Sequence, residues 1–141
     1  DHDVVTSENA HGYGLWWFEQ TPGDDGPQFT GHRIMGDQPE HNSYGVVVGN
    51  LHALCAADID GDGLLDVVTG NRYFAHGGRD RADGESPKLT WFELRRTDGV
   101  VSFAPHEIDG DSGVGTVTSP ATAARTSWSA TRRARSCTAT W

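Results

Sequence analysis

The chain has 141 residues, 20 acidic and 11 basic side chains, a formal charge of −9 and only 35 % hydrophobic residues. This length allows one domain with a modest core, and the excess of negative charge argues against a nucleic-acid partner. No stretch approaches the roughly 18 consecutive apolar residues of a transmembrane helix, so we expect no membrane span. The 18 glycines, together with many aspartates and no helical periodicity, indicate short strands joined by tight turns.

An internal repeat organises residues 1–116. The tetrapeptide Asp-Val-Val-Thr at residues 3–6 recurs at residues 66–69, and Trp-Phe-Glu at 17–19 recurs at 91–93. The order of the matches is kept along the chain, while the loops between them differ in length. Further equivalent pairs are His11 and His76, Phe29 and Phe103, His32 and His106, and Ile34 and Ile108. The repeat therefore predicts that one arrangement of strands is used twice.

The second copy is long enough for four strands. We predict them near Leu51–Ala57, which we interpret as a buried strand, and near Leu64–Thr69, Leu89–Leu94 and Val101–Glu107, with a tight hairpin turn between the last two. Four antiparallel strands that repeat about every 60–70 residues are typical of a propeller blade. One blade exposes both apolar faces, so it needs neighbouring blades. The predicted fold is all-β, a fragment of a β-propeller, with a partial blade at 1–45 and a complete blade at 46–116.

Residues 58–66 give the strongest chemical signal, with the sequence Asp-Ile-Asp-Gly-Asp-Gly-Leu-Leu-Asp. Carboxylates at alternate positions can surround a hard cation, while Gly61 and Gly63 supply the turn conformations. An EF-hand would require Glu at the twelfth position, which is Thr69, and helices on both sides. A solvated Asp-Gly turn is the alternative. The predicted ligands of a Ca²⁺ ion are Asp58, Asp60, Asp62, Asp66 and the backbone carbonyl of Leu64.

An Asp-x-Asp-x-Asp-Gly-x-x-Asp loop between strands, in repeats of this length, resembles the FG-GAP/VCBS repeat proteins with integrin-α-like propellers. The resemblance covers about residues 1–116. It implies a calcium-stabilised β-propeller, usually of about seven four-stranded antiparallel blades, of which this chain would hold about two. It also implies a secreted or surface-attached protein, often bacterial, located outside the cell, at its surface or in the periplasm. The implied partners are neighbouring blades and an unidentified extracellular protein or carbohydrate.

Residues 117–141 contain four arginines and no acidic residue, whereas residues 1–116 contain all 20 acids. Shifted by one base, codons for Thr118–Thr131 can encode D-V-A-G-D-G-G-A-D-V-V-V-G-N, which parallels residues 58–71. We therefore interpret this tail as a third blade read out of frame. A disordered basic tail is the alternative.

The function remains open between two classes. Equivalent histidines in both copies usually have a structural task, such as bonding a neighbouring strand or loop. Alternatively, some of them converge and bind a second metal such as Zn²⁺. We expect a non-catalytic scaffold for binding or adhesion, although a carbohydrate-active enzyme, a sugar lyase or dehydratase with a His-bound metal, is the alternative. The histidines that would distinguish the two are His11, His52, His76 and His106.

Overall fold

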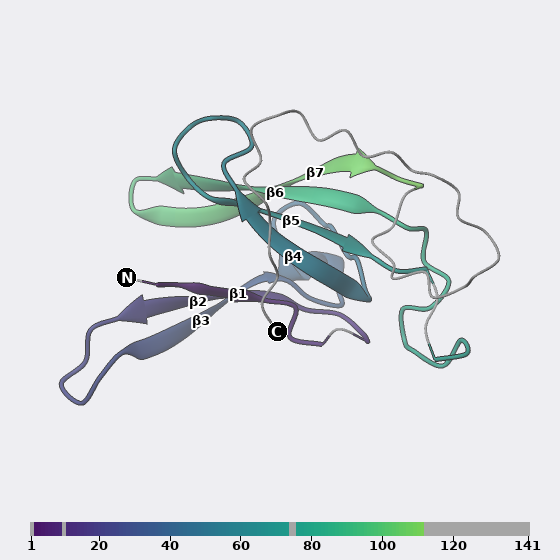
Figure 1. Ribbon diagram of the computed structural model, residues 1–141, viewed down its shortest axis with the longest axis horizontal. Coiled ribbons are helices and arrows are strands. Elements are labelled where there is room, and N and C mark those ends of the chain that lie inside the picture. The colour runs from purple at the N-terminus through teal and green to yellow at the C-terminus, as the bar shows by residue number, and fades with distance from the viewer. Residues whose placement is uncertain (1, 10, 74–75, 112–141) are drawn as a thin grey trace.

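A computed structural model describes residues 2–9, 11–73 and 76–111 of the protein. Apart from the 3-10 helix η1 (Pro39–His41), all regular elements in these ranges are strands, which form two antiparallel sheets (Figure 1). The prediction of an all-β fold is confirmed, and the arrangement is consistent with part of a β-propeller. The tail at 117–141 and its out-of-frame interpretation lie outside the described residues. The first sheet contains β1 (Val4–Thr6), β2 (Leu15–Thr21) and β3 (Gln28–Met35).

The second sheet has the four strands expected of a complete blade, in the order β4-β5-β6-β7. The strand β5 begins at Asp66 instead of Leu64, because the acidic loop continues through Leu65. The predicted hairpin is confirmed, since Asp98 and Gly99 have φ angles of 52° and 79°, as a two-residue turn with two left-handed positions requires. The bounds of the four strands are Leu51–Ala57, Asp66–Asn71, Leu89–Thr97 and Val100–Asp109.

The interpretation of Leu51–Ala57 as a buried strand is wrong. Leu51 is its one buried residue, while the others are half-buried or exposed. The strand lies at the edge of the sheet, and its pairing with β5 is interrupted between His52 and Cys55, where Ala53 has a φ of 59°. A bulge of this kind turns side chains away from the face that a regular strand would bury. Its apolar composition therefore does not translate into burial.

Strand pairing repeats with the sequence. Trp17 pairs with Val5 on one side and His32 on the other, and the equivalent Trp91 pairs with Val68 and His106. Even the irregularity in pairing recurs, between Leu15 and Trp16 in the first sheet and between Leu89 and Thr90 in the second. The two sheets are therefore two copies of one structural unit, in agreement with the sequence repeat.

The two sheets pack face to face around a shared core (Figure 1). Each sheet contributes large apolar side chains, and Trp17 of β2 also lies near Phe103 of β7, with ring centroids 6.3 Å apart. An isolated antiparallel bridge between Tyr13 and Gly49 joins the segments that precede β2 and β4. Burial of one apolar face against the other supplies the main driving force for this arrangement. The buried members of the core are Leu15, Trp17, Ile34, Met35, Val48, Leu51, Val67 and Phe92.

Two of the repeated histidines have the structural task that the sequence indicated. His32 stacks on Trp17 at 4.5 Å between ring centroids, and its Nε2 lies 3.2 Å from Glu19. In the second sheet, His106 stacks on Trp91 at 4.4 Å, and its Nε2 lies 2.6 Å from Glu93. The expectation that repeated histidines bond a neighbouring strand is confirmed for this pair of positions.

We predict that Gly49→Ala destabilises the protein, because the added Cβ would lie 2.1 Å from the Cβ of buried Ala82 and 2.9 Å from Cε1 of Tyr13. The Cβ of Ala82 cannot withdraw without moving the backbone, so the free energy of unfolding should fall by about 1–3 kcal/mol. Urea unfolding measures this loss. As a control, the same change should cost less in an Ala82→Gly background. An unchanged unfolding midpoint in Gly49→Ala would contradict the packing.

We also predict that the carboxyl of Glu93 titrates with a pKa of about 2, below its usual 4.5, because Arg95 and then His106 donate hydrogen bonds to it. The stabilisation is then complete above pH about 4.5 and is lost as the pH falls towards about 2. Carboxyl ¹³C NMR measures the pKa, and Glu93→Gln should remove this part of the pH dependence of unfolding. Arg95→Gln should raise the pKa of Glu93. A wild-type value near 4.5 would contradict the assignment.

Candidate functional site

The acidic loop connects β4 to β5 and gathers three of the predicted calcium ligands. Carboxylate oxygens of Asp58, Asp60 and Asp62 all lie within 4.8 Å of one another, and the three side chains are exposed. The predicted turn conformations are confirmed, because Gly61 and Gly63 have φ angles of 84° and 91°, which L side chains rarely adopt. The loop thus presents a cluster of hard oxygen donors to solvent, the type of ligand that Ca²⁺ prefers.

Backbone amides of the loop hold these carboxylates. Asp58 accepts hydrogen bonds from the N–H groups of Gly61 at 2.7 Å and Gly63 at 3.2 Å. Asp60 accepts one from Asp62 at 3.1 Å, and Asp62 accepts one from Leu64 at 2.7 Å. Each carboxylate keeps further lone pairs for a cation, because an ionised carboxylate has about four acceptor sites. These hydrogen bonds therefore fold the loop around its own carboxylates without a bound cation.

Asp66 has a different environment from the other three aspartates. It is fully buried, and its two oxygens accept hydrogen bonds from the backbone N–H of Ile59 at 3.1 Å and of Leu94 at 2.8 Å. Its carboxylate lies outside the group formed by Asp58, Asp60 and Asp62. The ligand roles of Asp66 and of the Leu64 carbonyl stay predictions.

A cleft of about 520 Å³ opens between the two sheets next to the acidic loop. Trp17 and Phe103 form part of its apolar wall, Asp3 and Arg96 contribute charges of opposite sign, and Leu64 borders it from the loop. Any change in the conformation of the loop would therefore alter one wall of this cleft.

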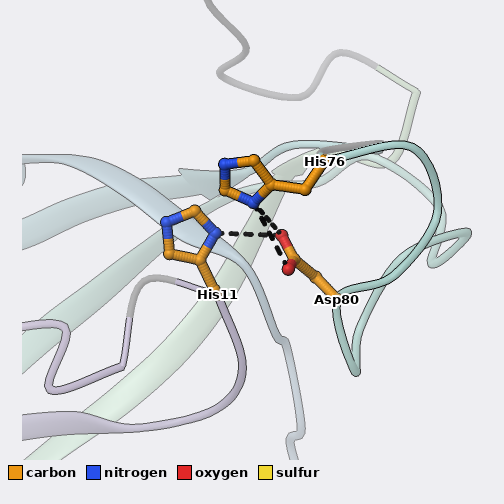
Figure 2. A group of neighbouring side chains, drawn as sticks. All are labelled: His11, His76 and Asp80. Atoms are coloured by element: carbon orange, nitrogen blue, oxygen red, sulfur yellow. Dashed lines mark hydrogen bonds and ion pairs between the residues drawn. The ribbon is translucent and has the colours of Figure 1, made fainter.

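A second cluster lies beyond the opposite end of β5, where the loops after β1 and β5 meet. Figure 2 shows His11 and His76 directed at the carboxylate of Asp80. Their Nδ1 atoms lie 2.9 Å and 3.1 Å from Asp80 Oδ2, and their rings stack at 4.5 Å. His52 packs edge-on against His11, with ring centroids 5.9 Å apart. The cluster brings together donors of the kind that transition metals prefer.

Polar contacts fix the carboxylate at the centre of this cluster. Arg72 Nη2 lies 3.2 Å from Asp80 Oδ2, and the backbone N–H of Asp80 donates to Asp83 Oδ2 at 3.1 Å. The hydrogen bond with His11, supported by the one with His76, holds the pKa of Asp80 below its usual value. Burial, together with the positive charge of Arg72, lowers the pKa of His52. Asp80 is therefore ionised and His52 neutral at neutral pH.

Tyr13 and Glu85 secure the same loop from the other side. The Tyr13 hydroxyl donates to Glu85 at 2.5 Å, which raises the pKa of Tyr13 to about 12. The other oxygen of Glu85 accepts a hydrogen bond from the N–H of Gly49 at 3.0 Å. The loop between β5 and β6 is thus tied to segments that precede β2 and β4.

Sequence reasoning identified the converging histidines only in part. His11, His52 and His76 come together, whereas His106 lies on Trp91 of β6, away from this cluster. Asp80 was missed, although its position four residues after His76, in the loop that lengthens the second copy, was an available signal.

A comparison with known protein families finds a match in the segment that contains the acidic loop. A model of the FG-GAP repeat matches residues 50–84, a segment that contains β4, the acidic loop, β5 and the residues up to Gly84. No curated protein and no solved structure matches the chain. Within the ranges described, no helix is long and apolar enough to cross a membrane. The similarity to FG-GAP repeats therefore lies in this segment, and the described part of the chain has an all-β architecture consistent with a section of a β-propeller.

Proposed function

We propose that this chain is a calcium-binding β-propeller module that serves as a binding or adhesion scaffold outside the cell. The observation that supports this best is the convergence of Asp58, Asp60 and Asp62 within the segment that matches the FG-GAP repeat. The partner would be an extracellular protein or a carbohydrate. Neighbouring blades would cover the exposed apolar side chains of the outer strands, such as Phe29 and Val100.

Electrostatics favour a cation at the acidic loop. Three carboxylates within 4.8 Å of one another repel, and the repulsion opposes the loop conformation that the backbone hydrogen bonds favour. A Ca²⁺ ion among them would replace this repulsion by attraction and would fix the loop. Extracellular calcium is abundant enough for sites with dissociation constants of about 10⁻⁴–10⁻³ M.

Calcium would also shape the surface on which a partner binds. The loop borders the cleft between the sheets, so an ordered loop would give this cleft a fixed wall at Leu64. The cleft combines aromatic rings with one acidic and one basic group, a composition suited to a polar partner with an apolar face. We therefore place the binding surface at this end of the strands.

We predict that Ca²⁺ raises the melting temperature of the chain and that Asp60→Ala abolishes this gain, because one of three converging carboxylates is removed. Thermal unfolding by circular dichroism, with calcium and with chelator, measures the effect. Asp25→Ala removes an exposed acid from the turn between β2 and β3 and serves as the matched control, which should retain the full gain. A wild-type melting temperature that is indifferent to calcium and to chelator would refute the calcium site.

The scaffold role predicts calcium-dependent capture of a partner. An immobilised chain should retain a member of a panel of extracellular matrix proteins and glycans in the presence of calcium, and chelator should release it. Asp60→Ala should lose the capture, whereas Asp25→Ala should keep it. If the partner binds equally well in the presence of chelator, its binding does not depend on calcium at the acidic loop, and this proposal is contradicted.

A further inference from the structure

We propose that His11, His76 and Asp80 form a zinc site that joins the two sheets of this protein. His11 belongs to the loop after β1, whereas His76 and Asp80 belong to the loop after β5 (Figure 2). The site is independent of the calcium proposal, because it lies beyond the opposite end of β5 from Asp58, Asp60 and Asp62 and uses nitrogen donors.

Two of the three distances between ligand atoms are close to those of a tetrahedral zinc centre, and the third is below 4.8 Å. Zinc binds histidine nitrogen and carboxylate oxygen at about 2.0–2.2 Å, which places neighbouring ligand atoms roughly 3.3 Å apart. The Nδ1 atoms of His11 and His76 lie 2.9 Å and 3.1 Å from the same oxygen of Asp80. The two rings are stacked at 30° to one another, so a rotation of the side chains would be needed to direct both lone pairs at one ion. Three protein ligands would leave the fourth position to water.

The protonation demands on His11 are in conflict without a metal. Its Nδ1 lies 2.9 Å from Asp80 Oδ2, which only accepts, and 2.5 Å from Arg72 Nη2, which only donates. A single ring nitrogen either holds a proton or presents a lone pair, so it satisfies one of these neighbours at a time. With the lone pair towards Arg72, an acceptor faces an acceptor across the contact with Asp80. A zinc ion between the histidine and the carboxylate would remove this conflict and displace the Arg72 donor.

The surroundings also suit a metal ion. The side chain of Asp80 is only 13 % exposed, while His11 and His76 are 45 % and 61 % exposed, so the carboxylate is held in place and the imidazoles give the ion access. His52 adds a neighbouring imidazole whose Nε2 is buried without a hydrogen-bond partner among the described residues.

Titration of the full 141-residue chain with Zn²⁺ tests the site, in the presence of excess Ca²⁺ so that the acidic loop is occupied. We expect one zinc equivalent to bind and to raise the melting temperature. Co²⁺ as a second probe should give the visible absorption bands of a four-coordinate site. His76→Asn should weaken zinc binding at least about tenfold. Asn is chosen because His76 has a φ of 42°, which Asn tolerates better than most residues.

His106→Gln is the matched control, since His106 is also a partly exposed histidine paired with one carboxylate, that of Glu93. It should bind zinc as the wild type does. Circular dichroism without zinc verifies that each variant is folded, and because His76 is exposed in a loop, its replacement should leave the core intact. A wild-type chain that binds no zinc, a His76→Asn variant with wild-type affinity, or a His106→Gln variant that loses zinc would overturn the proposal.

Discussion

The buried carboxylate of Asp66 is the constraint on which the arrangement of the second sheet depends. One of its oxygens accepts from the N–H of Ile59 in the acidic loop, and the other accepts from Leu94 in β6. A buried carboxylate is costly unless hydrogen bonds satisfy it, so the loop and the neighbouring strand are both drawn to this one group. In the first sheet, Asp3 likewise accepts a hydrogen bond from the backbone of Gln20, the residue equivalent to Leu94. The aspartates at the start of the equivalent strands β1 and β5 therefore each anchor a strand pair, whether or not a metal is bound.

Antiparallel pairing then places the acidic loop and the histidine cluster at opposite ends of the second sheet. Because β4 and β5 run in opposite directions, the loop between them lies at one end of the sheet and the loop after β5 at the other. The loop at the first end groups three carboxylates, which suit hard cations, and the loops at the second end group two imidazoles with one carboxylate, which suit zinc. The fold thus keeps two potential cation sites apart, so that neither ion competes for the ligands of the other.

Much of the fold was predictable because the signals are local or repeated. The Asp-Gly turn at residues 98–99 and the bounds of β4 follow from short-range patterns, and the repeat follows from matched residues such as Trp17 and Trp91. The burial of β4 was not predictable, because the bulge near Ala53 depends on tertiary packing. The convergence of Asp58, Asp60 and Asp62 was predictable from alternate spacing, whereas the place of Asp80 depends on contacts between loops far apart in the sequence.

The difference in loop length between the two copies determines which residues the histidine cluster contains. The three strands that the copies share repeat with the same register and the same irregularity in pairing, so these parts of the copies differ mainly in their connections. The connection between β1 and β2 covers residues 7–14, and the one between β5 and β6 covers residues 72–88. Asp80 belongs to the longer connection. Its carboxylate contacts His76 of the same connection and His11 of the shorter connection. Unlike His32 and His106, the equivalent histidines His11 and His76 therefore do not occupy equivalent sites. They meet at one shared carboxylate, and this makes the contact a junction between two sheets instead of a feature that each sheet repeats.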